Sequence, residues 1–175
     1  DPTWGIGPIP PVPDESLMDM FNRSVAKNPD KAAVIFLDRI TTYGELDRLS
    51  DRLARTLIDA GIQKGDRVAI MLPNCTQHVV AFYAILKAGG IIVPFNVMLK
   101  SDEVAYILKD SGARALIGLD LVYPLVQSEM EKLGLRKIIT VHVKDFADSK
   151  ATIPPLLAGE KNVPAGTQDF MDALE

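Results

Sequence analysis

Apolar runs and helix-length amphipathic stretches alternate regularly through the middle of the chain. Short apolar runs such as Val-Ala-Ile-Met-Leu are typical of strands that are buried on both faces. Each helix-length stretch that follows ends at a glycine, which suits the left-handed position after a helix. The pattern predicts strands at residues 68–72, 91–95, 115–117 and 137–141. Helices are expected at residues 75–87, 102–109 and 121–133, with Ser101 as the cap of the second.

This alternation specifies the class of fold. The expected strands start 23, 24 and 22 residues apart, which is the length of a strand–helix unit with short loops. Such units form a mostly parallel sheet with right-handed crossovers and helices on its faces. We therefore expect a three-layer α/β fold.

The pattern before this region predicts two helices and a hairpin. A helix is expected over residues 16–27, followed by a short antiparallel hairpin that turns at Asp38-Arg39. Thr42 and Glu45 have the spacing of a capping box, which predicts a helix from there to residue 60. Asp51 and Arg55 have the spacing and order of a favourable ion pair on that helix.

Both ends of the chain differ in composition from the middle. Residues 1–15 carry five prolines and predict an extended arm. Residues 16–143 carry the α/β pattern, whereas residues 144–175 are rich in proline and glycine. Within that last segment, residues 167–174 read as the first turns of a further helix that the end of the chain truncates.

Composition and charge narrow the classes of function. The 175 residues are 47% hydrophobic and 24% charged, which is ordinary for a globular domain. The net charge of −4 argues against a nucleic-acid partner, since such proteins more often carry a basic surplus. The single cysteine fits a reducing compartment, so we expect a cytoplasmic location. Residues 68–86 lack charged side chains, but Pro73-Asn74 and Gln77-His78 interrupt them, so no membrane span is expected.

No set of residues composes an active site by its own pattern. The turn after residues 68–72 is Pro73-Asn74 and lacks the glycines of a dinucleotide loop. Cys75 and His78 are one helical turn apart, and we interpret them as a buried cysteine and a surface histidine rather than as a nucleophile and its base. His142 has no partner in its local sequence and is interpreted as structural. We expect no metal site, because a chain with one cysteine and two histidines is a poor source of zinc ligands.

Four stretches, taken in order, resemble the adenylate-forming (AMP-dependent) acyl-CoA synthetases. They include Leu86-Lys-Ala-Gly-Gly-Ile-Ile-Val-Pro-Phe-Asn96, which is similar to the second core motif of that family. The others are residues 42–57, 61–74 and 103–112. The resemblance extends over roughly residues 16–141 and is strongest for fatty-acid–CoA ligases.

The resemblance implies an N-terminal fragment, an incomplete subdomain of a larger AMP-binding domain. Members use ATP and Mg²⁺ to convert a small-molecule carboxylate to an acyl adenylate, and they then transfer the acyl group to a thiol, usually that of CoA. The family's phosphate loop, its Tyr-Gly-x-Thr-Glu and Thr-Gly-Asp segments and its C-terminal lysine do not occur in this chain. We therefore expect no catalytic, ATP-binding or metal-binding residue here, no bound cofactor, and no activity of the fragment alone.

One family site is expected to be partly present. In CoA-using members, the loop after the second-motif strand lies near the channel for the pantetheine arm. Here that loop contains Asn96, Val97 and Met98. Many relatives have Asn-Pro where this chain has Asn96-Val97, and the alternative is that Asn96 caps a turn while Val97 and Met98 pack.

Two other functions stay open at this point. An adenylation domain that loads amino or aryl acids onto a carrier protein belongs to the same family and differs in its acceptor. A non-catalytic folding or docking module is a candidate from another class. The acid that is activated cannot be read from these residues, because the pocket-lining segments of the family lie elsewhere.

We predict that the isolated chain self-associates. In the family, the sheet begun here is continued and covered by later parts of the polypeptide, and exposed apolar faces and open sheet edges recruit partners. Light scattering at about 100 µM, a concentration at which weak contacts register, should show species larger than a monomer. A strictly monomeric chain would contradict the exposed-face argument.

Overall fold

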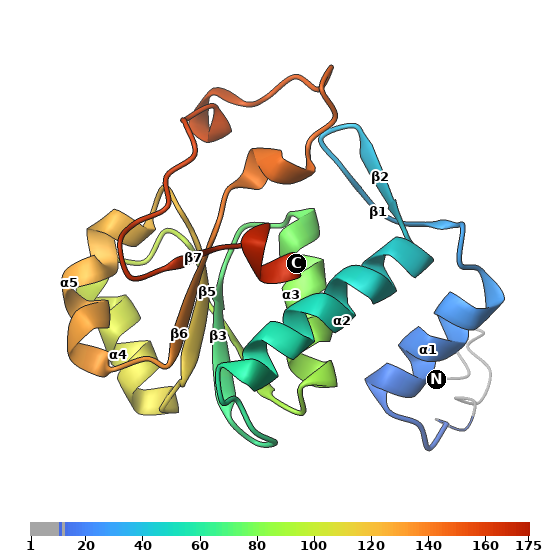
Figure 1. Ribbon diagram of the computed structural model, residues 1–175, viewed down its shortest axis with the longest axis horizontal. Helices are drawn as coiled ribbons and strands as arrows, with labels where there is room; N and C mark the ends of the chain where they lie inside the picture. The colour runs from blue at the N-terminus through green and yellow to red at the C-terminus, as the bar shows by residue number, and fades with distance from the viewer. Residues whose placement is uncertain (1–10, 12) are drawn as a thin grey trace, which may run out of the picture.

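The computed structural model describes Pro11 and residues 13–175, so most of the expected arm over residues 1–15 lies outside the described residues. Its centre is a parallel sheet of five strands in the order β4-β3-β5-β6-β7 (Figure 1). Every neighbouring pair in this sheet is parallel, as the alternating pattern predicts. The strands are β3 (Arg67–Met71), β4 (Ile91–Pro94), β5 (Ala115–Leu119), β6 (Lys137–Val141) and β7 (Gln168–Asp169).

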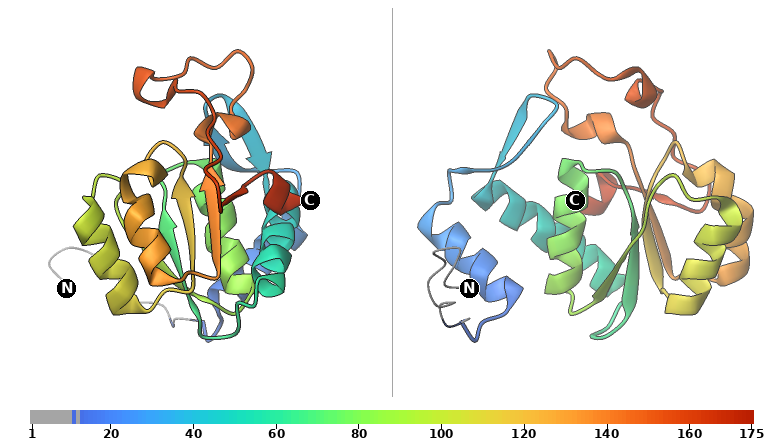
Figure 2. Two further views of the ribbon diagram at one scale, coloured as in Figure 1. Left: turned by 60° about the vertical axis from the view of Figure 1, so that its left-hand side comes forward. Right: turned by 180° about the vertical axis from the view of Figure 1, so that it is seen from behind.

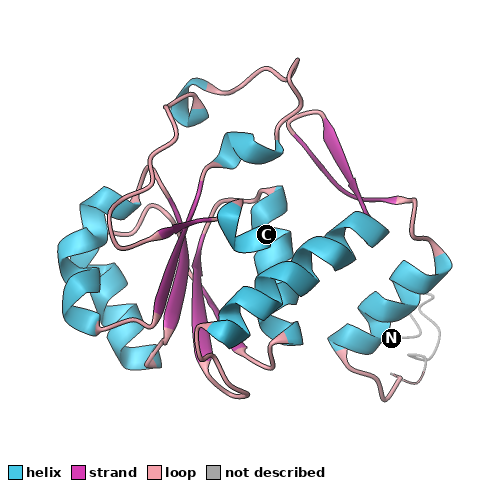
Figure 3. Ribbon diagram, in the orientation of Figure 1, coloured by secondary structure: helices cyan, strands magenta, loops and turns pink. Residues whose placement is uncertain are grey.

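Helices cover both faces of the sheet and complete three layers (Figure 2). Two helices lie on one face, namely α2 (Tyr43–Asp59) and α3 (Thr76–Lys87). Two lie on the other face, namely α4 (Ser101–Ser111) and α5 (Tyr123–Leu133). The three-layer α/β fold is therefore confirmed, and helices, strands and loops follow one another as Figure 3 shows.

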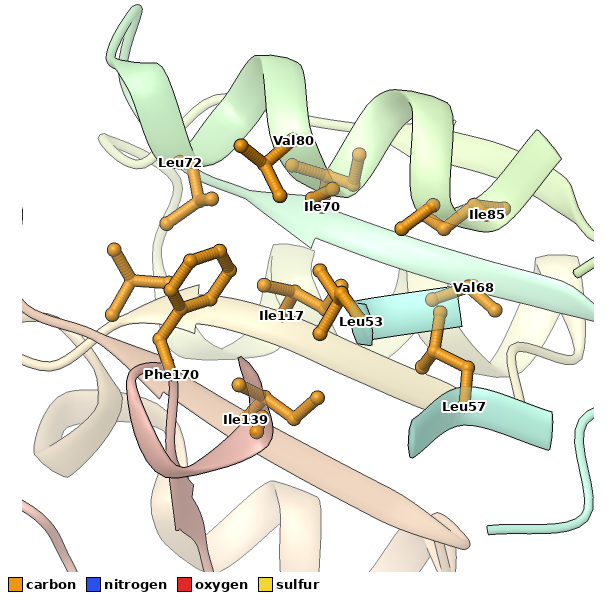
Figure 4. Close-up of a cluster of buried hydrophobic side chains, with 14 of the residues drawn as sticks. Leu53, Leu57, Val68, Ile70, Leu72, Val80, Ile85, Ile117, Ile139 and Phe170 are labelled. Carbon is orange, nitrogen blue, oxygen red and sulfur yellow. The ribbon is translucent and has the colours of Figure 1, made fainter. Parts of the chain in front are cut away.

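The main core lies between the sheet and helices α2 and α3 (Figure 4). Leucines of α2 and β-branched residues of three strands fill it, because strand residues alternate between faces and helix residues recur every three or four positions. Removing a large side chain from such a core costs about 2–5 kcal/mol. Its members include Leu53, Leu57, Val68, Ile70, Val80, Ile85, Ile117, Ile139 and Phe170.

The N-terminal hairpin forms a separate sheet of two antiparallel strands, β1 (Ala32–Phe36) and β2 (Arg39–Thr42). Its turn is Leu37-Asp38, one residue earlier than expected, and both residues have positive φ angles of 45° and 60°. Two-residue hairpin turns with this geometry match the twist of the strands. The preceding helix α1 (Leu17–Lys27) stacks Phe21 on Tyr83 of α3 at a ring-centroid distance of 3.9 Å.

Two local predictions about side-chain pairs are wrong. Thr42 accepts the expected hydrogen bond from the Glu45 N–H at 3.2 Å, but the Glu45 side chain pairs with Arg39 instead of closing a capping box. Arg55 pairs with Asp59, whereas Asp51 pairs with Lys87 of the neighbouring helix. In both cases, the carboxylate forms its ion pair with a residue of another element, Glu45 with Arg39 and Asp51 with Lys87.

The cap of α4 also differs from the prediction. Ser101 is the first residue of the helix, and Lys100 occupies the N-cap position. The Lys100 N–H donates to Glu103 Oε2 at 2.9 Å, so a carboxylate in the first turn satisfies the N–H of the N-cap residue.

The end of the chain adds a strand where a helix was expected. Residues 167–174 form β7, parallel to β6, and then the single 3₁₀ turn η4 (Asp172–Leu174). The open edge of β6 supplies partners for this backbone, which a truncated helix would leave unpaired. Thr56 of α2 donates to the Ala173 carbonyl at 2.7 Å, and Phe170 is fully buried. The division of the chain at residues 15 and 143 stays a prediction.

Strand β4 forms one edge of the sheet and ends in a proline. Pro94 lies opposite Ile70 in the pairing register, and the next residue, Phe95, donates its N–H to the Ile70 carbonyl at 3.0 Å. Because successive main-chain groups point to opposite sides of a strand, the ring nitrogen of Pro94 points away from β3. The proline is thus accommodated without the loss of a hydrogen bond within the sheet.

Lys87 joins α3 to α2, and we predict that its loss destabilises the fold. Its Nζ lies 2.6 Å from Oδ1 of both Asp47 and Asp51, and its side chain is only 12% exposed. Replacement Lys87→Met should lower the free energy of unfolding in urea by about 1–3 kcal/mol, since hydrogen bonds to charged groups are lost. The control Arg55→Met removes an exposed pair within α2, the helix that carries Asp47 and Asp51, and should change the free energy far less. Equal effects of the two variants would contradict this assignment.

Candidate functional site at the carboxyl edge of the sheet

The strand order creates a crevice at the carboxyl ends of β3 and β5. From β3 the chain passes to α3 on one face of the sheet, and from β5 it passes to α5 on the other face (Figure 2). The two loops therefore diverge, and ligands of open α/β sheets bind at such switch points.

An apolar cavity of about 260 Å³ lies at this crevice. Its wall comes from the loops that follow three neighbouring strands and from the 3₁₀ turn η3 (Pro155–Leu157). The volume lies below the roughly 300–1,000 Å³ of sites for drug-sized ligands, so it suits a slim chain better than a whole nucleotide. The lining residues are Pro73, Val97, Met98, Leu119, Leu121, Val122 and Leu157.

The structure separates the three residues that the family resemblance singles out. Val97 and Met98 line the cavity, whereas Asn96 is exposed and is not part of its wall. Asn96 Oδ1 accepts the Met98 N–H at 2.9 Å, so this side chain shapes the loop. Met98 is 78% exposed, which leaves its thioether available at the rim of the cavity. The role of all three residues in CoA binding stays a prediction.

Asp120 and His142 meet beside the cavity, although sequence reasoning missed the pair. His142 Nδ1 lies 2.7 Å from Asp120 Oδ2, and the side chains are 5% and 1% exposed. Asp120 follows β5 and His142 follows β6, so both extend from the carboxyl edge of neighbouring parallel strands. That shared position was the available signal, because polar residues directly after adjacent parallel strands lie at one edge of the sheet.

Cys75 and His78 do not form a nucleophile and base. Burial raises the pKa of the Cys75 thiol to about 11, so the thiol stays protonated at neutral pH. His78 Nδ1 lies 3.4 Å from the Leu72 carbonyl, at the start of helix α3. This arrangement agrees with the structural interpretation of both residues.

The amino end of α3 is covered by protein and does not face the crevice as a phosphate site. Thr76 and Gln77 are fully buried there. Gln77 Nε2 donates to the carbonyls of His142 and Val143 at 3.0 and 3.3 Å, so the segment after β6 lies against this helix end. The buried carboxylate of Asp120 beside the crevice would also repel a polyphosphate.

No group of three or more histidine, cysteine, aspartate or glutamate side chains among the described residues could hold a metal ion. No helix within the same residues combines the length and the apolar character needed to cross a membrane.

The family model described as AMP-binding enzyme matches residues 21–168, which include strands β3 to β6 and reach the first residue of β7. This chain belongs to the AMP-binding enzyme family. The match contains both the crevice and the residues that line its cavity, so the site described above lies within the family's shared domain.

Relatives of this AMP-binding domain include a long-chain-fatty-acid–CoA ligase and a tyrocidine synthase. The long-chain-fatty-acid–CoA ligase of Bacillus subtilis (strain 168) is 38% identical over 137 residues, which are 78% of this chain and 24% of that protein. Tyrocidine synthase 1 of Brevibacillus parabrevis is 33% identical over 144 residues, 77% of this chain and 13% of that protein. The chain thus spans a quarter or less of these relatives.

A solved structure shares the fold. The anthranilate CoA ligase AuaEII in complex with anthranoyl-AMP superimposes with a TM-score of 0.75 at 25% identity. The superposition covers 89% of this chain and 27% of that chain. The α/β architecture described here is therefore that of one part of an adenylate-forming ligase.

The burial of Cys75 leads to a prediction about its reactivity. With a pKa of about 11, roughly one thiol in a thousand is ionised at about pH 8. Reaction with a chromogenic disulfide reagent should be slow in the native chain, become fast in concentrated urea, and accelerate as the pH approaches 11. Fast native reaction at about pH 8, at the rate seen in urea, would show that the thiol is exposed or activated.

Proposed function

We propose that this chain is the N-terminal part of an ATP-dependent acyl-CoA ligase whose substrate is a fatty acid. The observation that carries the proposal is the 38% identity to a long-chain-fatty-acid–CoA ligase over most of the chain. The apolar lining of the cavity at the carboxyl edge is consistent with a substrate or cofactor that brings a flexible chain to this edge.

The second part of the proposal assigns the cavity to the pantetheine arm of CoA. Val97 and Met98 line it, and the pantetheine arm is a slim chain that fits its volume. In this assignment, Asn96 has an indirect role. Its side-chain oxygen accepts a hydrogen bond from the Met98 N–H, which fixes the position of Met98 in the loop. The adenine and phosphate groups of CoA would extend away from this apolar wall.

The proposal leaves the handling of ATP and Mg²⁺ to residues outside this chain. The turn after β3 contains no glycine, the amino end of α3 is buried, and a carboxylate lies at the crevice. These features do not fit a triphosphate or its metal ion, because phosphate sites present main-chain N–H groups and cations. This chain's own residues would shape one wall of the thiol channel and exclude water from it.

A second candidate keeps the family and changes the acid and the acceptor. Relatives at 33% identity include tyrocidine synthase 1 and the malpibaldin synthetase of Mortierella alpina, and the similar structure AuaEII is an anthranilate CoA ligase. An adenylation domain for an amino or aryl acid is therefore the alternative. The cavity favours CoA or another pantetheine thiol without separating a free cofactor from a carrier protein.

The experiment that tests the proposal uses the longest polypeptide in which this chain occurs. ATP–pyrophosphate exchange should be stimulated by long-chain fatty acids, and CoA should then convert the adenylate to a thioester. Stimulation by amino or aryl acids alone would favour the second candidate. No exchange with any carboxylate would favour a docking module over an enzyme.

We predict that the 175-residue chain alone neither binds ATP tightly nor hydrolyses it. The physical reason is that the described crevice offers a buried carboxylate and that the amino end of α3 is covered, where a triphosphate needs donors and cations. Isothermal titration calorimetry with Mg·ATP should show no binding at micromolar concentrations. A dissociation constant of about 1 µM or less would contradict the prediction.

A further inference from the structure

The segment from Ala147 to Gly166, here called the roof segment, passes over the carboxyl edge of the sheet (Figure 1). It contains η3, and Leu157 of that turn contributes to the wall of the cavity and packs against the main core. At Gly159, the roof segment lies close to Leu121, which is another residue of the cavity wall. A Cβ at this position would lie 2.9 Å from Cδ2 of Leu121, so the roof segment lies directly on the cavity wall.

Polar contacts hold the roof segment at several places, and one of them runs from Lys144 Nζ to the Ala158 carbonyl at 3.2 Å. The Asp148 N–H donates to the Leu37 carbonyl at 2.9 Å, which ties one end to the hairpin. Lys161 Nζ lies 2.8 Å from carboxylate oxygens of Asp145 and Asp169, but its side chain is 35% exposed. Water and salt weaken such half-exposed pairs.

A further contact is half-buried and adjoins the cavity, because its acceptor Asp120 is buried while Asn162 is exposed. The Asn162 N–H donates to Asp120 Oδ2 at 3.1 Å, and Asp120 lies between the cavity-lining residues Leu119 and Leu121. This bond connects the roof segment directly to the wall opposite Leu157.

Both oxygens of the Asp120 carboxylate are engaged. Oδ1 accepts the Leu121 N–H at 2.8 Å, and Oδ2 accepts the Asn162 N–H and lies 2.7 Å from His142 Nδ1. With its hydrogen on Nδ1, His142 donates to Oδ2. A buried charge is tolerated when several donors satisfy it, and each of those bonds is stronger than a neutral one.

We propose that Asp120 is a positioning residue of the thiol channel, which holds the roof segment through Asn162 so that Leu157 closes the cavity. The inference rests on the proposed function for the identity of the ligand, whereas the contact between Asp120 and the roof segment does not. His142 supports the arrangement by filling the remaining acceptor position of Oδ2 and fixing the direction of the carboxylate. Asp120 therefore controls access to the cavity without touching the ligand.

The variant Asp120→Asn tests the anchor with little change of shape. Its side-chain amide offers one acceptor oxygen and one N–H₂ group, so it cannot accept on both sides as the carboxylate does. Hydrogen exchange of the Asn162 amide, followed by NMR in the intact chain, should accelerate at least about tenfold, because the acceptor of its hydrogen bond is no longer charged. The amide of Ile117, in the middle of β5, should keep its rate and so report that the fold is intact.

Asp145→Asn provides the matched control. It removes one carboxylate from Lys161, the half-exposed anchor of the same roof segment, and leaves Asp120 and Asn162 in place. Asn162 exchange in this variant should stay within about twofold of the wild-type rate, since exposed pairs contribute little. Equal acceleration in both variants would overturn the special role of Asp120.

Pantetheine itself tests the link to the ligand. Its addition to the wild-type chain should shift the methyl signals of Met98 and Leu157, and Asp120→Asn and Leu157→Ala should each weaken this binding by about three- to tenfold. If Asp120 acts through Leu157, the double variant should bind no more weakly than either single variant. A merely structural role would instead give losses that multiply.

The outcomes separate the two levels of the proposal. An unchanged Asn162 exchange rate in Asp120→Asn overturns the anchor. Accelerated exchange without any pantetheine-induced shift in the wild-type chain supports the anchor and overturns the assignment of the cavity to pantetheine. If Asp120→Asn fails to fold, His142→Gln loosens the same carboxylate and should accelerate Asn162 exchange in the same direction.

Discussion

The fold depends on the burial of strand β3 on both of its faces. Val68, Ala69, Ile70 and Met71 are all fully buried, and they contact α2 and α3 on one side and the smaller cluster around α4 on the other. Only a strand with helices on both faces can be apolar at every position. Its neighbours β4 and β5 pair with it on opposite sides, and this arrangement sends the following loops apart. The crevice that carries the candidate site is thus a consequence of how the central strand is buried.

Much of the fold could be predicted from the sequence because the pattern of the central region is local. The apolar runs and the glycines that end the helices specify the strands and helices of residues 67–141 to within a few positions. The last strand was not predictable in this way. Gln168 and Asp169 have no strand character of their own, and they form β7 only because the edge of β6 lies beside them. Long-range pairing overrode the local signal for a helix start.

The side-chain pairs also depend on contacts between distant parts of the sequence, which local patterns do not reveal. The spacing rules for Thr42 with Glu45 and for Asp51 with Arg55 consider one helix at a time, whereas the actual partners Arg39 and Lys87 come from other elements. Asp120 and His142 are separated by a whole strand–helix unit, so nothing in the local sequence joins them. The cavity could be placed at the carboxyl edge from topology, but its buried carboxylate needed the three-dimensional register of β5 and β6.

Pro94 has a consequence for how this sheet can grow. Its nitrogen carries no hydrogen and points outward from the edge strand, so the free edge of β4 lacks a main-chain donor at that position. A strand approaching this edge would leave one of its own carbonyls unpaired. The two edges of the sheet therefore differ in their capacity to pair with a further strand. The β4 edge lacks one N–H donor because of Pro94, and the other edge is the two-residue strand β7. Extension by further strands is easier beside β7, where each residue keeps both a main-chain N–H donor and a carbonyl acceptor.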